Sequence, residues 1–167
     1  MASHLRLASS TAGADSVPSA PSPIRVVLSD DHAPMRSSLR MVLDGEDGVE
    51  VVGEANDLES VEREVREHRP HVLVLDLGMR NGSSVIEAIG PLREHAPETM
   101  IVGSTMQEDP AFAQHSLTAG AVGFVSKELA DAELGQAVRA AAHGETFVSE
   151  RVAARLRAQR GGSLDDR

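Results

Sequence analysis

Short, Val-rich apolar runs alternate with longer amphipathic stretches along this chain, and no other feature constrains its fold as strongly. The runs are almost continuously apolar, as strands are when helices cover both of their faces. In the stretches between them, apolar residues recur about once per helical turn. The runs are Ile24–Ser29, Val49–Glu54, His71–Asp76, Met100–Ser104 and Ala121–Val125, and the helical stretches are Pro34–Asp44, Leu58–His68, Val85–His95, Pro110–Gly120 and Ala130–His143.

This alternation predicts an α/β fold: a doubly wound, five-stranded parallel sheet of the flavodoxin-like (βα)5 type with strand order 2-1-3-4-5. Gly90-Pro91 is expected to bend the third helix, because proline lacks the backbone donor that a helix interior needs. Asp109 followed by Pro110 is typical of a helix start, and Gly120 of a helix end. A further helix is expected over residues 149–160.

The two ends of the chain differ from its middle in composition. Residues 1–23 are rich in Ser, Ala and Pro without a hydrophobic period, which predicts a disordered leader. Residues 24–148 should form one domain, and residues 161–167 a disordered tail. The helix over 149–160 fits either a linker to a further domain or an extra helix packed on this one.

Charge and composition exclude several classes of protein. The 167 residues include 26 Asp and Glu against 16 Lys and Arg, a formal net charge of −10, which argues against DNA binding by this chain alone because such binding relies on cationic side chains. The absence of cysteine excludes disulfides and thiolate sites, and it fits the cytoplasm. No apolar run approaches the ~18 residues of a membrane span, so no membrane partner is expected.

Acidic side chains gather at the predicted carboxyl ends of neighbouring strands. Asp30 and Asp31 follow the first run, and Asp76 ends the third. Strands one and three are neighbours at the point where the strand order reverses, which is where ligands bind in such sheets. Carboxylates that close raise one another's pKa unless a cation neutralises them, and oxygen ligands of this kind suit Mg²⁺. Helix capping is the alternative for each residue taken singly.

Two more polar residues fall at the same edge. With Mg²⁺ bound, Asp76 can attack a phosphoryl group as a nucleophile. Lys127 can then supply a positive charge to the phosphoryl oxygens, and the Thr105 hydroxyl can donate a hydrogen bond to another oxygen. The alternatives are a solvated surface lysine and an ordinary β-branched residue at a strand end.

At these positions the sequence resembles the response regulator receiver family, specifically its NarL/FixJ (LuxR-type) members. The resemblance covers about Ile24 to Val148. It rests on segments in the family's order and spacing: Asp30-Asp31-His32, Asp76-Leu77-Gly78-Met79, Thr105-Met106-Gln107-Glu108-Asp109 and Gly123-Phe124-Val125-Ser126-Lys127-Glu128.

The resemblance implies a role for each matching residue. Asp76 would be phosphorylated by a sensor histidine kinase. Asp31, Asp76 and the Gly78 backbone carbonyl would ligate Mg²⁺ directly, and Asp30 would act through water. Thr105 and Phe124 would form a switch pair, in which the hydroxyl moves toward the phosphoryl group and the ring turns inward. Packing in the core accounts equally well for Phe124.

Some positions depart from the family's pattern. Arg80 stands where Pro is common, Ser84 where Gly is frequent, and His71 where an acidic residue is frequent. Gly103-Ser104 softens a strand end that is usually more apolar. These departures put the geometry of the acceptor loop and the choice of kinase in question, but they remove no essential group.

The expected function is therefore phosphoryl acceptance by a receiver domain, not turnover as an enzyme. By the same resemblance, phosphorylation would favour a homodimer, and DNA would be bound only through a C-terminal helix-turn-helix domain that the sequence up to Arg167 does not include. A phosphate-independent binding module of the same fold is one rival. An enzyme on this fold is another, although no Gly-rich phosphate loop follows the first strand.

Overall fold

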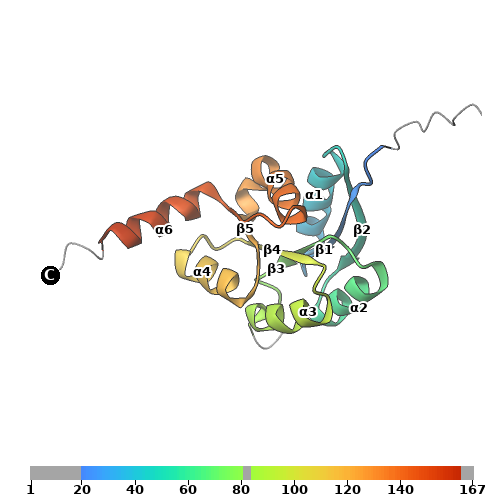
Figure 1. Cartoon of the computed structure of the whole chain (residues 1–167), viewed down its shortest axis with the longest axis horizontal. Helices are drawn as coiled ribbons and strands as arrows, with labels where there is room; N and C mark the ends of the chain where they lie inside the picture. Colours follow the sequence, from blue (N-terminus) through green and yellow to red (C-terminus); the bar gives the residue numbers. More distant parts are fainter. Residues whose placement is uncertain (1–19, 81–83, 163–167) are drawn as a thin grey trace, which may run out of the picture.

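A six-stranded, all-parallel sheet with strand order β2-β1-β3-β4-β5-β6 forms the centre of the molecule (Figure 1). The computed structural model describes residues 20–80 and 84–162, so most of the expected leader and the last part of the expected tail lie outside the described residues. The strands are β1 (Ile24–Ser29), β2 (Val49–Ala55), β3 (Val72–Asp76), β4 (Met100–Thr105), β5 (Gly123–Ser126) and β6 (Phe147–Val148).

The expected order of the first five strands agrees with the structure, but the expected number of strands was wrong. The sixth strand, β6, has two residues, and it pairs in parallel with Gly123 and Phe124 of β5. A two-residue strand carries no detectable alternation of polar and apolar residues, so periodicity could not reveal it. It extends the sheet beyond β5 and leads the chain directly into the last helix.

Helices cover both faces of the sheet, as the continuously apolar strands require. Figure 1 shows α1 and α5 on one face and α2, α3 and α4 on the other. The helices are α1 (Ala33–Asp44), α2 (Leu58–His68), α3 (Ile89–His95), α4 (Pro110–Ala119), α5 (Ala130–Ala142) and α6 (Glu150–Gly162), with 3-10 turns η1 (Val85–Ala88) and η2 (Lys127–Leu129).

Each layer of helices has its own hydrophobic core. Leu39 and Leu43 of α1 pack with Leu134 and Val138 of α5 against one face. The core on the other face is larger, and it contains buried residues of α2, η1, α3, α4 and α6 together with Phe124 of β5. Strand side chains point alternately to the two cores, which is why β1 contributes Val27 to one and the side chains on either side of it to the other.

Local sequence explains some of the helix ends. At the start of α2, the Asp57 side chain accepts a hydrogen bond from the Ser60 N–H at 2.7 Å, and the Ser60 hydroxyl accepts one from the Asp57 N–H at 3.1 Å. Gly90 and Pro91 do not bend one long helix as expected; they lie in the first turn of α3, after the separate turn η1. Proline is tolerated there because first-turn amides have no partner within the helix.

The last helix, α6, is only partly attached to the domain. Figure 1 shows it extending away from the sheet beside α4, with its far end pointing outward. Val152 in its first half is fully buried, and Leu156 packs against the same core. Residues 157–161 of the helix are all exposed. This helix begins one residue later than expected, and its role as a linker stays a prediction.

Candidate functional site

The three acidic residues at the carboxyl ends of β1 and β3 lie together. Each of Asp30, Asp31 and Asp76 offers a carboxylate oxygen within 4.8 Å of the others. Asp30 is 0% exposed and Asp76 is 2% exposed, whereas Asp31 is open to solvent. A hollow of about 520 Å³ opens at this edge, lined by all three together with Thr105 and other residues of the adjoining loops.

None of these carboxylates caps a helix. The N-cap of α1 is His32 and that of η1 is Ser84. Instead, each carboxylate accepts a hydrogen bond from a loop amide: Asp30 Oδ1 from His32 N–H at 2.9 Å, Asp31 Oδ2 from Arg80 N–H at 3.0 Å and Asp76 Oδ1 from Gly78 N–H at 2.9 Å. The loops after β1 and β3 thus orient the acidic cluster, and the helix-capping interpretation was wrong.

Lys127 reaches into this cluster from the end of β5. Its Nζ lies 2.7 Å from Asp30 Oδ2 and 3.0 Å from Asp76 Oδ1, and its side chain is 7% exposed. It is therefore not a solvated surface lysine. With the three carboxylates ionised and the lysine protonated, the cluster carries a net charge of −2.

Burial and mutual contact shift the pKa values of this group. Burial raises the pKa of the Asp76 carboxyl, and the neighbouring Asp30 charge adds to this, while the hydrogen bonds from Lys127 and the Gly78 amide oppose it without cancelling it. Burial by itself would lower the pKa of Lys127, but its hydrogen bonds to Asp30 and Asp76 outweigh that effect, so the pKa is raised. The lysine therefore stays charged, and ionising Asp76 costs more free energy than ionising an exposed carboxyl.

The composition of the cluster fits a divalent metal ion. Its donors are carboxylate oxygens only, which hard cations such as Mg²⁺ prefer. One lysine leaves two of the three negative charges uncompensated, and an ion of charge +2 would neutralise them. Gly78, whose carbonyl was expected to be a ligand, lines the same hollow.

The expected switch residues lie on the adjoining strands. Thr105 at the end of β4 is 2% exposed, and its Oγ1 accepts a hydrogen bond from the Gln107 N–H at 3.0 Å. The Phe124 ring is fully buried and meets the Phe112 ring of α4 edge to face, with centroids 6.4 Å apart. Core packing is thus what the structure shows for Phe124.

Phe112 and Met106 also line the hollow beside Asp76, although the sequence assigned neither of them a role. Met106 is 53% exposed, which is unusual for a large apolar side chain in this molecule. Its place directly after Thr105 was the only available signal. For Phe112 the sequence offered none, because one aromatic residue on a helix is ordinary core composition.

The loop after β4 is tied to α6 through Glu108. The Glu108 carboxylate accepts hydrogen bonds from the Ser126 hydroxyl at 2.9 Å and from the Arg151 guanidinium at 3.3 Å. Its backbone carbonyl accepts one from the Arg155 guanidinium at 2.9 Å. Ser126 directly precedes Lys127, so Glu108 links α6 to the residue next to Lys127.

Two of the departures from the family pattern, Gly103 and His71, have local explanations. A Cβ atom on Gly103 would lie 2.7 Å from Leu77 Cδ1, so the glycine leaves room for the residue that follows Asp76. His71 Nδ1 accepts the Arg25 N–H at 2.9 Å. Ser84 is exposed and makes no capping hydrogen bond with its side chain. Nothing in the structure explains the buried Ser104 hydroxyl, which has no hydrogen-bond partner among the described residues.

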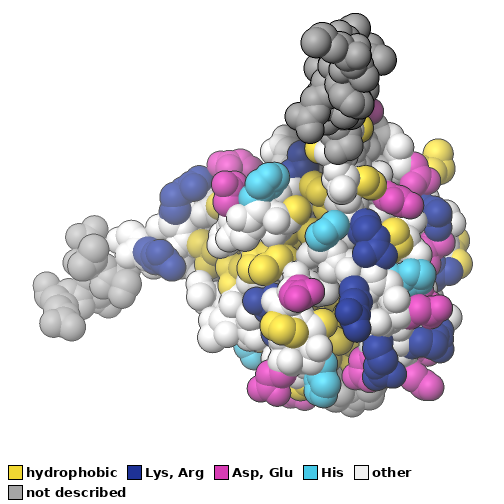
Figure 2. Space-filling model, turned by 45° about the vertical axis from the view of Figure 1, so that its right-hand side comes forward, with side chains coloured by type: hydrophobic (Ala, Val, Ile, Leu, Met, Phe, Trp, Pro, Cys, Tyr) yellow, Lys and Arg dark blue, Asp and Glu magenta, His cyan; other side chains and the backbone are white. Residues whose placement is uncertain are grey.

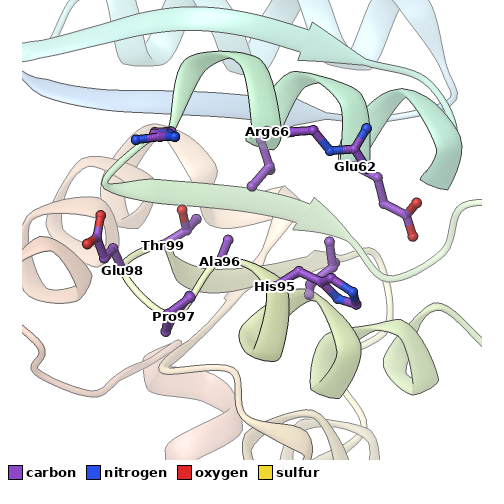
Figure 3. A pocket seen from close by; sticks show the side chains of 10 residues that line it. Glu62, Arg66, His95, Ala96, Pro97, Glu98 and Thr99 are labelled. Atoms are coloured by element: carbon purple, nitrogen blue, oxygen red, sulfur yellow. The ribbon is translucent and has the colours of Figure 1, made fainter.

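A second hollow, of about 430 Å³, lies between α2 and the end of α3 (Figure 3). Its lining mixes acidic side chains (Glu62, Glu98) with basic ones (Arg66, His95) around a small apolar floor. Figure 2 likewise shows Arg, His, Asp and Glu side chains interspersed on the face that it turns forward. The second hollow therefore mixes charges of both signs, whereas acidic side chains predominate in the hollow beside Asp76.

Within residues 20–80 and 84–162, one other group has the composition of a metal site. Glu64, Glu67 and His68 lie on one face of α2, with His68 Nε2 3.1 Å from Glu64 Oε2. Residues three and four apart on a helix are neighbours, and such pairs are common on helix surfaces.

In the part of the chain that the structure describes, no helix has the length and apolar composition needed to cross a membrane.

Comparison with known proteins supports the fold and the family. The family profile described as response regulator receiver domain matches residues 26–139. The oxygen regulatory protein NreC of Staphylococcus epidermidis is 38% identical over 133 residues, which are 80% of this chain and 61% of NreC. The chain thus spans about three fifths of the length of the curated relatives it matches.

Solved structures agree. A two-component response regulator of the LuxR family from Aurantimonas sp. is 34% identical, with a TM-score of 0.78 over 83% of this chain and 99% of that one. The RcsB response regulator of Salmonella typhimurium, in a structure that concerns its conformational dynamism for DNA interaction, is 29% identical. It gives a TM-score of 0.75 over 81% of this chain and 67% of its own.

Proposed function

Because this chain belongs to the response regulator receiver domain family, we propose that it accepts a phosphoryl group on Asp76 from a sensor histidine kinase. The observation that carries this proposal is the arrangement around Asp76. Among the described residues, every hydrogen bond and ion pair of its carboxylate is made by Oδ1, which contacts the Gly78 amide and Lys127. Oδ2 is left to act as the nucleophile.

In the proposed reaction, an Asp76 carboxylate oxygen attacks the phosphorus of a phosphohistidine. The new O–P bond forms as the N–P bond breaks, and the imidazole of the kinase leaves with that electron pair. Nucleophilic attack needs an ionised carboxylate, and the ammonium of Lys127, 3.0 Å from Asp76 Oδ1, favours that state. The same ammonium compensates the negative charge that the phosphoryl oxygens bring.

We propose Mg²⁺ as the resident cation, held by Asp30, Asp31, Asp76 and the Gly78 carbonyl. When bound, it neutralises the oxygens of the incoming phosphoryl group and orients them. The Arg80 N–H donates a hydrogen bond to Asp31 Oδ2 at 3.0 Å, which keeps this carboxylate facing the cluster. The Thr105 hydroxyl lines the same hollow, and it is free to turn and donate a hydrogen bond to a phosphoryl oxygen.

The output of the proposed switch lies beyond this chain's own chemistry. The relatives are longer than this chain, and the RcsB structure concerns DNA interaction. We therefore propose that phosphorylation favours a homodimer of a cytoplasmic protein whose DNA contact is made by a helix-turn-helix domain outside the present sequence. Thr105 and Phe124 are the proposed switch pair, and the chain itself is not proposed to turn over a substrate.

Labelling with a small phosphodonor tests the proposal. Acetyl phosphate with Mg²⁺ should add one phosphoryl group per chain, detected as an intact-mass increase. Asp76→Asn should abolish the label, whereas Asp44→Asn should not, because Asp44 is 56% exposed at the end of α1. A label that persists in Asp76→Asn would refute the site. Continuous consumption of the donor would indicate an enzyme, and an unlabelled wild type would indicate a phosphate-independent binding module.

A further inference from the structure

Ser29, the last residue of β1, makes a contact with β3 that strand pairing alone does not provide. The pairing between β1 and β3 runs from Val26↔Val72 to Leu28↔Val74 and stops before the acceptor residue. Beyond that point the Ser29 hydroxyl makes the contact between the two strands. It accepts a hydrogen bond from the Asp76 N–H at 3.2 Å and donates one to the Val74 carbonyl at 3.0 Å.

These two bonds complete the support of the acceptor residue. On its other side, β3 remains paired with β4, with Asp76 opposite Ser104 and the Leu77 N–H bonded to the Ser104 carbonyl at 2.9 Å. The Asp76 carboxylate is held separately, by the Gly78 amide and Lys127. The Ser29 hydroxyl is therefore what fixes the Asp76 backbone on the side of β1.

The chemistry of this position supports a specific role rather than simple filling of space. Ser29 is 0% exposed in a strand whose other inner positions are Val and Leu. Burying a hydroxyl is unfavourable unless it is hydrogen-bonded, and here both its donor and an acceptor site are used. The buried Ser104 hydroxyl at the same edge shows the contrast, because it has no partner among the described residues.

We propose that Ser29 is a positioning residue for phosphoryl transfer: its hydroxyl fixes the backbone of Asp76 and thereby the direction of the acceptor carboxylate. This inference rests on the proposed function of Asp76. Without the hydroxyl, the Asp76 N–H is buried with no acceptor, and the end of β3 shifts to reach another partner. The carboxylate then moves relative to Lys127 and to the other acidic side chains.

The test compares Ser29→Ala, which removes the hydroxyl, with Ser29→Thr, which keeps it. Loss of one buried hydrogen bond should slow labelling of Asp76 by acetyl phosphate by roughly fivefold. The backbone ¹⁵N–¹H resonance of Asp76, recorded without metal or phosphodonor, should shift and its hydrogen exchange should accelerate. Ser29→Thr should restore the rate and the resonance.

A matched control separates positioning from general loss of stability. Thr99, 4% exposed at the opposite edge of the sheet, donates its hydroxyl to the Pro70 carbonyl at 2.8 Å. Thr99→Val should be destabilised toward urea about as much as Ser29→Ala. It should still be labelled at the wild-type rate. If Ser29→Thr does not fold, Ser29→Cys, of similar size and weaker hydrogen bonding, should fall between the wild type and Ser29→Ala.

Two outcomes overturn the inference: Ser29→Ala labelled as fast as the wild type, or Thr99→Val slowed as much as Ser29→Ala. An unlabelled wild type would refute the proposed function instead. The Asp76 resonance then still reports on the hydrogen bond, and a resonance unchanged in Ser29→Ala would overturn the contact itself.

Discussion

Among the described residues, Lys127 is the one cation that lies between the buried carboxylates, and replacing it with Met removes that charge. Methionine has a similar length, so packing should change little while the charge disappears. The lysine Nζ lies 2.7 Å from Asp30 and 3.0 Å from Asp76, and all three side chains are at most 7% exposed. Lys127→Met therefore leaves two buried carboxylates without their partner.

The magnitude follows from the burial of these charges. Removing one partner of a buried ion pair costs about 3–5 kcal/mol, because the remaining charge stays desolvated. We expect a loss in that range at neutral pH without divalent metal. Mg²⁺ should restore part of the lost stability. A ligand that binds only the folded state contributes about 2.7 kcal/mol when its concentration is 100 times its Kd.

The pH dependence has a definite sign. Burial already raises the pKa of Asp76 in the folded protein, and loss of Lys127 removes an influence that lowers it. A carboxyl whose pKa is higher in the folded state than in the unfolded state opposes folding once it is ionised. The cost of Lys127→Met should therefore be largest at neutral pH, and it should shrink as the pH falls through the folded pKa toward the ordinary value of 3.8.

Urea unfolding followed by far-ultraviolet circular dichroism measures this loss, with a chelator and with Mg²⁺, across that pH range. Arg157→Met is the matched control, because the ion pair of Arg157 with Glu150 is 68% and 80% exposed and should contribute almost nothing. A loss below about 1 kcal/mol, or one that does not change with pH, would contradict the account of Lys127 as the counter-charge of a buried acidic cluster.

Two further predictions concern the same edge of the sheet. Asp76→Asn should raise the urea midpoint at neutral pH in chelator, because burial raises the pKa of Asp76 and its ionised form opposes folding. The gain in midpoint should disappear at acid pH. An unchanged or lower midpoint at neutral pH would contradict this prediction. Arg155→Ala should increase amide hydrogen exchange in α6 but not in α5, because it removes the hydrogen bond to the Glu108 carbonyl. Arg157→Ala is the control. Equal exchange in the two variants would show that the contact between Arg155 and Glu108 does not hold the helix.

The order of elements was determined locally and could be predicted from the sequence. Val-rich runs such as Val72–Asp76 and amphipathic stretches such as Leu58–His68 report which of their own residues are buried, and the alternation of the two types implies a parallel sheet. Since parallel strands end at one edge, the meeting of Asp30, Asp31 and Asp76 there also followed from sequence. Strand β6 did not, because two residues show no period.

Tertiary structure alone decided how these side chains contact one another. Lys127 and Asp30 are 97 residues apart, and their 2.7 Å contact depends on the register of strands that lie between them. The bridge from Ser29 to Asp76 depends on where the pairing of β1 and β3 stops. Burial of Asp30 beside an exposed Asp31 depends on the path of the following loop. Periodicity along a chain records burial, whereas these contacts are set between segments distant in sequence, so only the assembled sheet determines them.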